Sequence, residues 1–234
     1  MTAFSSTPSR SRLPSFDPQQ VPVLGIDSHL PPVPALAQTP EALRQRFAQP
    51  PLHWQPEVLY EPAFSERSQA AAAVLVPIVL REQPTVLLTE RSMHLSSHSG
   101  QVAFPGGRVD PEDASVTAAA LREAEEEIGL EPHWVEVIGT LPTYVTGSAY
   151  VVAPVVALVQ PQCTLHANPH EVADIFEVPL AFLMNPANHR RHAFEWQGVR
   201  REWFSMPYQH GEKTHYIWGA TAGMLRNFYR FLQA

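Results

Sequence analysis

Residues 122–130 read Arg-Glu-Ala-Glu-Glu-Glu-Ile-Gly-Leu, an acidic segment that lies a short way after Phe104-Pro105-Gly106-Gly107. On a helix, Glu123, Glu126 and Glu127 are spaced i, i+3 and i+4, so the pattern predicts three carboxylates on one face. Like charges at this spacing repel each other, and a helix with nothing to neutralise them would do better with Lys or Gln at one position. Clustered oxygen ligands are what Mg²⁺ or Mn²⁺ binds, with substrate phosphates often completing the shell.

The helix that carries these glutamates has recognisable ends. Asp110-Pro111-Glu112-Asp113 is a helix-start signal, with an Asp cap, Pro at the first position and acids in the first turn. Gly129 is expected to end the helix after Ile128. An apolar stripe runs along the opposite side and consists of Thr117, Leu121, Ala124 and Ile128. We therefore expect one face to pack and the other to show its carboxylates.

The bulk properties exclude several classes of protein. The chain has 234 residues and a net charge of −7, which argues against coating nucleic acid. No segment approaches the roughly 18 apolar residues of a membrane span, since the apolar run at 70–80 is short and contains Pro77. A single cysteine, Cys163, excludes an internal disulfide and a cysteine-based zinc site. We expect a cytoplasmic protein that acts on a small molecule, with no nucleic-acid or membrane partner. The sequence leaves room for a homodimer.

Two regions differ in composition. Residues 1–38 are rich in Pro and are predicted to form an N-terminal arm that is partly extended or disordered. Residues 39–234 are predicted to form one domain. Thr39 and Pro40 open a short helix that runs to about Phe47, with Thr39 as its N-cap.

The rest of the domain predicts a mixture of strands and helices. Residues 71–81 and 85–90 form an expected β-hairpin, followed by a loop over 91–107. Residues 135–141, 150–159 and 171–178 are further expected strands, and the second is apolar enough to be central. A helical turn at 179–184, a second hairpin over 191–196 and 201–208, and a terminal helix over 219–232 follow. This order predicts an α+β or α/β fold, a helix–mixed sheet–helix sandwich.

The glycine, the acidic linker and the helix together resemble the Nudix box. That unit is a loop–helix–loop that binds divalent metal and hydrolyses nucleoside diphosphates linked to another group. The positions that match it are Arg122, Glu123, Glu126, Glu127 and Gly129. The first Glu of the family pattern falls on Ala114, and the neighbouring Asp113 is the candidate substitute.

Further features are similar to the coenzyme A pyrophosphatase branch of that family. The interval after Gly107 is one residue longer than usual, and residues 87–92 read Leu-Leu-Thr-Glu-Arg-Ser ahead of Gly100. Residues 217–222, Ile-Trp-Gly-Ala-Thr-Ala, also look like this branch. The upstream motif expects an Arg where this chain has Ser96, so that task is unfilled or passes to Arg91, His94 or His98. The resemblance implies cleavage of coenzyme A or its derivatives into 3′,5′-ADP and 4′-phosphopantetheine or its acyl form.

The resemblance also implies roles for the acidic residues. Glu126 and Glu127 are the main expected ligands of Mg²⁺ or Mn²⁺, and Glu123 is either a third ligand or the base. A metal ion neutralises charge in the transition state and lowers the pKa of a bound water. Arg122 is interpreted as an orienting partner that keeps a glutamate ionised. Glu171, in a Pro-containing loop, is a candidate base or extra ligand.

The expected substrate contacts lie around the same helix. They are Arg91, His98, Gly106, Gly107 and Tyr144, and a backbone carbonyl of one of the two glycines could also serve the metal. Several of these have simpler explanations. Arg91 could pair with an acid on the surface, the glycines could serve only the turn, and Tyr144 and Trp218 could be core aromatics rather than partners of adenine.

Two other functions stay open at this point. Ser96 favours a hydrolase for ADP-ribose or another nucleoside diphosphate derivative. Ala114 favours a Nudix-fold nucleotide-binding protein without activity, although such a protein has no need of Glu123, Glu126 and Glu127.

Overall fold

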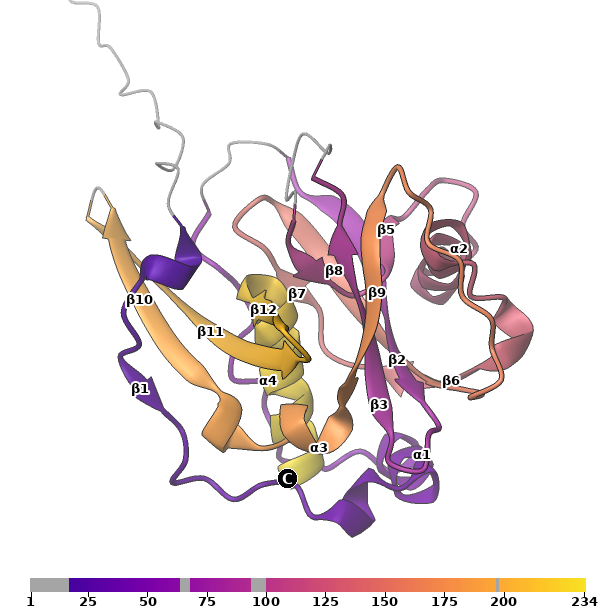
Figure 1. Ribbon diagram of the computed structural model, residues 1–234, viewed down its shortest axis with the longest axis horizontal. Coiled ribbons are helices and arrows are strands. Elements are labelled where there is room, and N and C mark those ends of the chain that lie inside the picture. Colours follow the sequence, from indigo (N-terminus) through magenta and orange to yellow (C-terminus); the bar gives the residue numbers. More distant parts are fainter. Residues whose placement is uncertain (1–16, 64–67, 94–99, 197) are drawn as a thin grey trace, which may run out of the picture.

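The structure is a computed structural model that describes residues 17–63, 68–93, 100–196 and 198–234. Two β-sheets form most of this part of the chain (Figure 1). The larger sheet is mixed and contains β2 (Ala70–Val79), β3 (Thr85–Arg91), β4 (Val102–Ala103), β5 (Gly106–Arg108), β6 (Val135–Thr140), β7 (Tyr144–Val145), β8 (Tyr150–Val159) and β9 (Val172–Pro179). The smaller sheet is antiparallel and contains β1 (Gly25–Ile26), β10 (Arg190–Trp196), β11 (Val199–His210) and β12 (Lys213–Trp218).

Helices cover both faces of the larger sheet. The α-helices are α1 (Pro40–Ala48), α2 (Val116–Ile128), α3 (Leu180–Leu183) and α4 (Gly219–Gln233), and short 3₁₀ turns lie at Pro18–Gln20, Ala35–Gln38, Pro132–Trp134 and Pro186–Asn188. One hydrophobic core joins α2 to the larger sheet, and a second joins the opposite face to α4 and the smaller sheet. In Figure 1, α4 lies between the two sheets. The predicted helix–mixed sheet–helix sandwich is confirmed, with the smaller sheet added outside α4. None of the described helices has the length and apolar character that a membrane span requires.

The centre of the larger sheet is the parallel pair β2 and β8, which runs in register from Ala70–Tyr150 to Val79–Val159. Both strands are almost continuously apolar, as expected for strands that are covered on both faces. The central position predicted for residues 150–159 is confirmed, because β8 has β2 on one side and β6 on the other. The predicted β2–β3 hairpin is also confirmed, with Val79 opposite Thr85.

The start of α2 differs from the prediction. The helix begins at Val116, where the Ser115 hydroxyl accepts a hydrogen bond from the Ala118 N–H at 3.1 Å. Asp113 instead accepts from the Asp110 N–H at 2.8 Å and closes a turn. An Asp-Pro pair favours turns as well as helix starts, and the Ser cap five residues after Asp110 sets the boundary. The predicted end is confirmed, since Gly129 has a left-handed φ of 66°.

Residues 17–38 pack against the remainder of the described chain. β1 pairs with β10, and the buried carboxylate of Asp27 binds Arg191 at 2.8 Å and Arg226 at 2.9 Å. The Tyr229 hydroxyl donates to the Pro31 carbonyl at 2.9 Å. This segment therefore adds a strand to the smaller sheet and contacts Arg226 and Tyr229 of α4. A domain boundary at residue 38 stays a prediction.

The smaller sheet is only partly anticipated by the sequence. The predicted second hairpin is confirmed as β10 and β11. β12 is missed, although it pairs with β11 from Ser205–Trp218 to His210–Lys213. Its first residues are polar, so the strand lacks the apolar alternation by which strands are usually found.

Candidate active site

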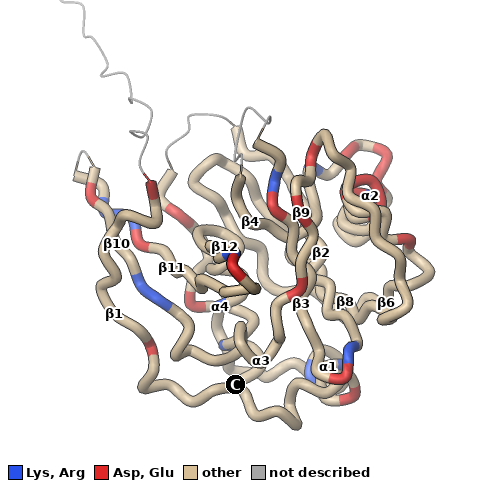
Figure 2. The backbone as a smooth tube through the Cα atoms, in the orientation of Figure 1, with Lys and Arg blue, Asp and Glu red and all other residues tan. Residues whose placement is uncertain are grey.

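The acidic helix α2 lies against β2 and β5, and its buried apolar residues anchor it there. Ala119, Ala120, Ala124 and Ile128 are buried in the core that α2 shares with the larger sheet. Acidic positions gather on α2 and on the segment leading to it (Figure 2). The three predicted ligands differ greatly in exposure, because the side chains of Glu127, Glu123 and Glu126 are 4%, 15% and 55% exposed. The expectation that all three carboxylates face solvent is therefore wrong.

Glu127 is the innermost of the three. One oxygen, Oε2, accepts a hydrogen bond from the Gly106 N–H at 3.1 Å, and the other lies 3.6 Å from the Arg91 guanidinium. Burial raises the pKa of Glu127 to about 7, although the Gly106 N–H and Arg91 oppose this rise. The charges of Glu123 and Glu171 add to it. Glu127 is thus a buried carboxylate whose negative charge is incompletely balanced.

Glu123 lies against the backbone of β5. A Cβ atom placed on Gly107 would lie 2.5 Å from Glu123 Oε1, so only glycine leaves room for the carboxylate. Burial raises the pKa of Glu123 as well, although Arg122 opposes the rise. Gly106 has a different reason to be glycine, since its φ is 154° and an added Cβ would lie 2.4 Å from the Ala73 carbonyl oxygen. The glycine pair brings the β5 backbone and the carboxylates together.

Arg122 brackets the cluster from its outer side. Its guanidinium donates to both oxygens of Asp113, at 3.0 and 2.9 Å, and to Glu123 and Glu126 at 3.1 and 3.0 Å. It also donates to the Arg108 carbonyl at 3.1 Å. Such a planar fork holds carboxylates in fixed positions. The same contacts lower the pKa of Asp113 and raise that of Arg122.

Ala114 occupies the position of the family's first Glu, and its neighbour Asp113 has different surroundings. Ala114 is exposed, whereas Asp113 binds Arg122 in a bidentate pair. Asp113 therefore fixes Arg122, and Arg122 in turn positions Glu123 and Glu126.

The loop that carries Glu171 approaches the end of α2. The Asn168 N–H donates to the Glu127 carbonyl at 2.8 Å, and the Ser92 N–H donates to the Glu171 carbonyl at 2.8 Å. The charge of Glu171 raises the pKa of both Glu123 and Glu127, so its carboxylate lies within electrostatic reach of them. The anchoring role of Asn168 is not predicted from the sequence, although its Asn-Pro pair signals a turn.

The other predicted substrate contacts fall into two groups. Arg91 and the two glycines lie beside Glu127 and Glu123. Tyr144 does not, because its ring is buried in the core on the opposite face of the sheet and its hydroxyl donates to Glu61 at 2.9 Å. His94, Ser96 and His98 lie outside the described residues.

The donors on α2 and β5 fit a divalent cation. They are carboxylate oxygens, which Mg²⁺ and Mn²⁺ prefer. Burial and neighbouring carboxylates raise the pKa of both Glu123 and Glu127, so a cation beside them would relieve a repulsion already present in the fold. Glu123, Glu126 and Glu127 are the residues that would hold it.

This fold and this site define a class, the hydrolases that use a metal-binding glutamate helix beside a mixed sheet. The sequence model of the NUDIX domain matches residues 69–204, and the chain belongs to the Nudix family. The "Uncharacterized Nudix hydrolase NudL" of Escherichia fergusonii is 49% identical over 156 residues, which cover 66% of this chain and 79% of that protein. Its counterpart in Escherichia coli (strain SMS-3-5 / SECEC) is 48% identical over the same length and the same shares of both chains.

Solved structures are more distant. A C. elegans Ap4A hydrolase binary complex is 23% identical, with a TM-score of 0.41 over 47% of this chain and 80% of that one. The NUDIX domain of Shewanella oneidensis NrtR complexed with ADP ribose is 24% identical, with a TM-score of 0.39 over 49% of this chain and 75% of that one.

Membership in the family carries the general activity. The protein is a pyrophosphohydrolase that acts on nucleotide pyrophosphates, as Nudix hydrolases do. Enzymes of this family generally use divalent metal ions, in agreement with the carboxylates on α2.

Proposed function

We propose that this protein hydrolyses the pyrophosphate bond of coenzyme A or its derivatives to give 3′,5′-ADP and 4′-phosphopantetheine or its acyl form. The observation that carries this proposal is the motif at residues 87–92 together with Phe104-Pro105-Gly106-Gly107. Both parts of the motif meet at one carboxylate, because Arg91 approaches Glu127 at 3.6 Å and the Gly106 N–H donates to it. The longer interval before α2 and the segment 217–222 support the same branch of the family.

The chemistry rests on charge. When bound, a divalent cation neutralises charge in the transition state and lowers the pKa of a water that attacks phosphorus. Glu123, Glu126 and Glu127 would hold it, and Arg122 fixes two of these carboxylates so that little reorganisation would be needed. Arg91 and the glycine turn border the space next to Glu127, where a substrate phosphate would lie. Tyr144 has a packing role.

The base is Glu123 or Glu171. Glu123 is fixed by Arg122, whereas Glu171 belongs to a loop that lies over the same cluster. A base and a metal ligand differ in their pH–rate profiles. Replacing the base by Gln removes the acidic limb of the profile, whereas replacing a ligand lowers the rate at every pH and raises the metal concentration required.

The direct test is to incubate the protein with coenzyme A and Mg²⁺ and to identify the products by chromatography. We expect 3′,5′-ADP in equal amount to 4′-phosphopantetheine. Much faster cleavage of ADP-ribose, NADH or a nucleoside triphosphate would contradict the coenzyme A assignment while leaving the hydrolase intact.

A second candidate substrate is ADP-ribose or another nucleoside diphosphate derivative. Ser96 favours it, since the coenzyme A motif expects an Arg there. Replacing Ser96 by Arg separates the two. The change should lower KM for coenzyme A if that is the substrate, and should not do so for ADP-ribose. A cytoplasmic location and a homodimer also stay predictions.

A further inference from the structure

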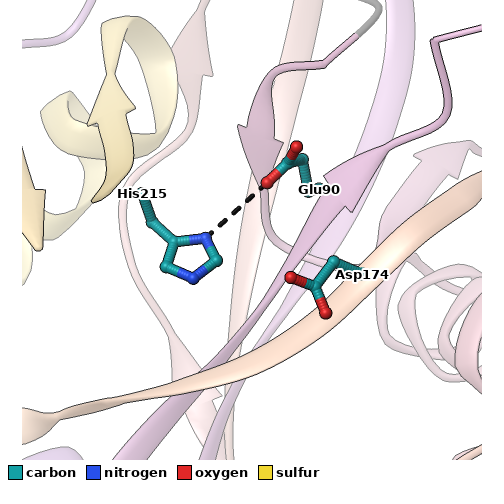
Figure 3. Close-up of side chains that lie close together, drawn as sticks. All are labelled: Glu90, Asp174 and His215. Atoms are coloured by element: carbon teal, nitrogen blue, oxygen red, sulfur yellow. Dashed lines mark ion pairs between the residues drawn. The ribbon is translucent and has the colours of Figure 1, made fainter. Parts of the chain in front are cut away.

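A second cluster of possible metal ligands lies away from α2. Glu90 of β3, Asp174 of β9 and His215 of β12 point toward one another (Figure 3). One oxygen from each carboxylate and one ring nitrogen lie within 4.8 Å of each other. These three residues, with Lys213 beside them, are called the β3–β9–β12 cluster below.

The two carboxylates are brought together by strand pairing. Glu90 and Asp174 are direct partners in the antiparallel register of β3 and β9. Like charges at directly opposite positions destabilise a sheet unless a cation lies between them. The β3–β9 register shifts between Glu90 and Arg91, and the side chains of these two neighbours contact different sites. Arg91 approaches Glu127, whereas Glu90 faces Lys213 and His215 of β12.

His215 is held in place without a hydrogen bond to its Nδ1 atom. Its side chain is 2% exposed, and its ring stacks on Phe176 with centroids 3.6 Å apart and planes 15° apart. Among the described residues, Nδ1 has no hydrogen-bond partner and lies 3.6 Å from Glu90 Oε2. A buried ring nitrogen in this state is costly and calls for an explanation. Burial, with help from Lys213, lowers the pKa of His215, which leaves the neutral imidazole that binds metals.

Lys213 supplies a positive charge to the cluster. Its Nζ atom lies 2.9 Å from Glu90 and 2.8 Å from Asp174. One ammonium leaves two carboxylates with a net charge of about −1, whereas a divalent cation would balance both. The Lys213 side chain is 49% exposed and has a flexible stem, so it can move into solvent.

We propose that Glu90, Asp174 and His215 form a second divalent-cation site, which is occupied when Lys213 moves out. One imidazole and two carboxylates suit Zn²⁺ or a similar transition-metal ion better than Mg²⁺, which prefers oxygen ligands alone. Three protein ligands leave a fourth position for water or a substrate group. The site differs in chemistry from the glutamates of α2, which offer only oxygen.

The test is a Zn²⁺ titration of the wild-type protein, followed by NMR of ¹⁵N-labelled histidine with Mg²⁺ in excess to occupy α2. The His215 resonances are assigned by their loss in His215→Gln, and the remaining histidine signals report whether that variant is folded. We expect Zn²⁺ to shift the His215 Nδ1 resonance. The exposed His133, which lies 3.4 Å from Glu131, is the matched control for weak binding by a lone His–Glu pair. Its resonances should move only at much higher Zn²⁺.

Lys213→Gln tests the displacement step. Removing the competing ammonium should tighten Zn²⁺ binding by about tenfold or more, and Asp174→Asn should weaken it by a similar factor. An unmoved His215 Nδ1 signal in both the wild type and Lys213→Gln at roughly millimolar Zn²⁺ would overturn the site. Equal affinities of the wild type and Lys213→Gln would overturn the role given to Lys213.

Discussion

Two carboxylate clusters in this protein have their negative charges balanced in different ways. The first, the arm network, joins the N-terminal segment to α4 and consists of Asp27, Glu57, Arg191 and Arg226. The second, the α2 cluster, lies between α2 and β5 and consists of Glu123, Glu126 and Glu127. Each acid of the arm network contacts two arginines at 2.7–2.9 Å. In the α2 cluster the innermost acid has one arginine, at 3.6 Å.

The pKa values record the difference. Burial would raise the pKa of Asp27 and of Glu57, but the hydrogen bonds and charges of Arg191 and Arg226 outweigh it and hold both below their usual values. In the α2 cluster burial prevails, and the pKa of Glu127 rises to about 7. The arm network is therefore complete in the protein alone. The charge of the α2 cluster is not balanced by the protein alone, and we expect a divalent cation to complete it.

Glu127→Gln should have the largest effect on activity. Loss of a metal ligand is expected to lower kcat/KM on the order of 10²-fold or more. The cation-free protein should be as stable as the wild type or more so, because a buried charge has been removed. Steady-state kinetics and denaturation in EDTA measure the two quantities. Glu125→Gln, an exposed neighbour on the same helix, is the control and should change neither.

Glu57→Gln should lower the stability of the protein and leave its activity nearly unchanged, the opposite of Glu127→Gln. It leaves Arg226, whose side chain is 1% exposed, without one of its two acids. We expect the free energy of unfolding to fall by about 2 kcal/mol while the activity of the folded enzyme changes little. Urea denaturation gives the stability. Glu41→Gln removes an exposed partner of Arg44 and should leave stability unchanged. Equal stability of both variants would contradict the role of the arm network.

Gly107→Ala tests how closely β5 meets the cluster. The new Cβ would lie 2.5 Å from Glu123 Oε1, so the carboxylate must move. We expect activity to fall on the order of tenfold or more through misplacement of Glu123. Gly25→Ala is the control, since nothing lies within 4 Å of a Cβ there. Normal activity in Gly107→Ala would show that Glu123 has no fixed role.

The smallest expected effect is on the pH dependence of metal binding by the α2 cluster, and it should still be measurable. The folded protein raises the pKa of Glu127 to about 7, so protonation of Glu127 stabilises the cation-free protein. This stabilisation is fully present at pH values below the ordinary pKa of Glu, and it is lost as the pH rises through about 7. A divalent cation replaces that proton. The rise in Tm caused by Mg²⁺ should therefore be larger at about pH 8 than at about pH 5.5, by roughly 2–4 °C. Scanning calorimetry measures it, and equal shifts at both pH values would argue against Glu127 as a ligand.

The sequence predicts local features well. The end of α2 at Gly129, the first hairpin and the central strand follow from turn chemistry and continuous apolar runs. The assignment of Glu123, Glu126 and Glu127 as metal ligands stays a prediction. The start of α2 is misplaced because Asp110-Pro111 and Ser115 are both acceptable starts, and only packing selects between them.

Non-local features were out of reach of the sequence. Glu127 has partners far away in the sequence, since its carboxylate accepts from the Gly106 N–H of β5 and its carbonyl accepts from the Asn168 N–H of a distant loop. The β3–β9–β12 cluster joins residues 90, 174 and 215, which no spacing rule connects. β12 is missed for a related reason, since Lys213 and His215 of this strand contact Glu90 of β3 rather than an apolar core.

The central claim is that the α2 cluster is completed by a divalent cation. Isothermal titration calorimetry with Mg²⁺ on the wild type, Glu127→Gln and Glu57→Gln tests it most directly. We expect the wild type and Glu57→Gln to bind Mg²⁺ with similar affinity and Glu127→Gln to lose the binding heat. Equal binding by the wild type and Glu127→Gln would contradict the claim.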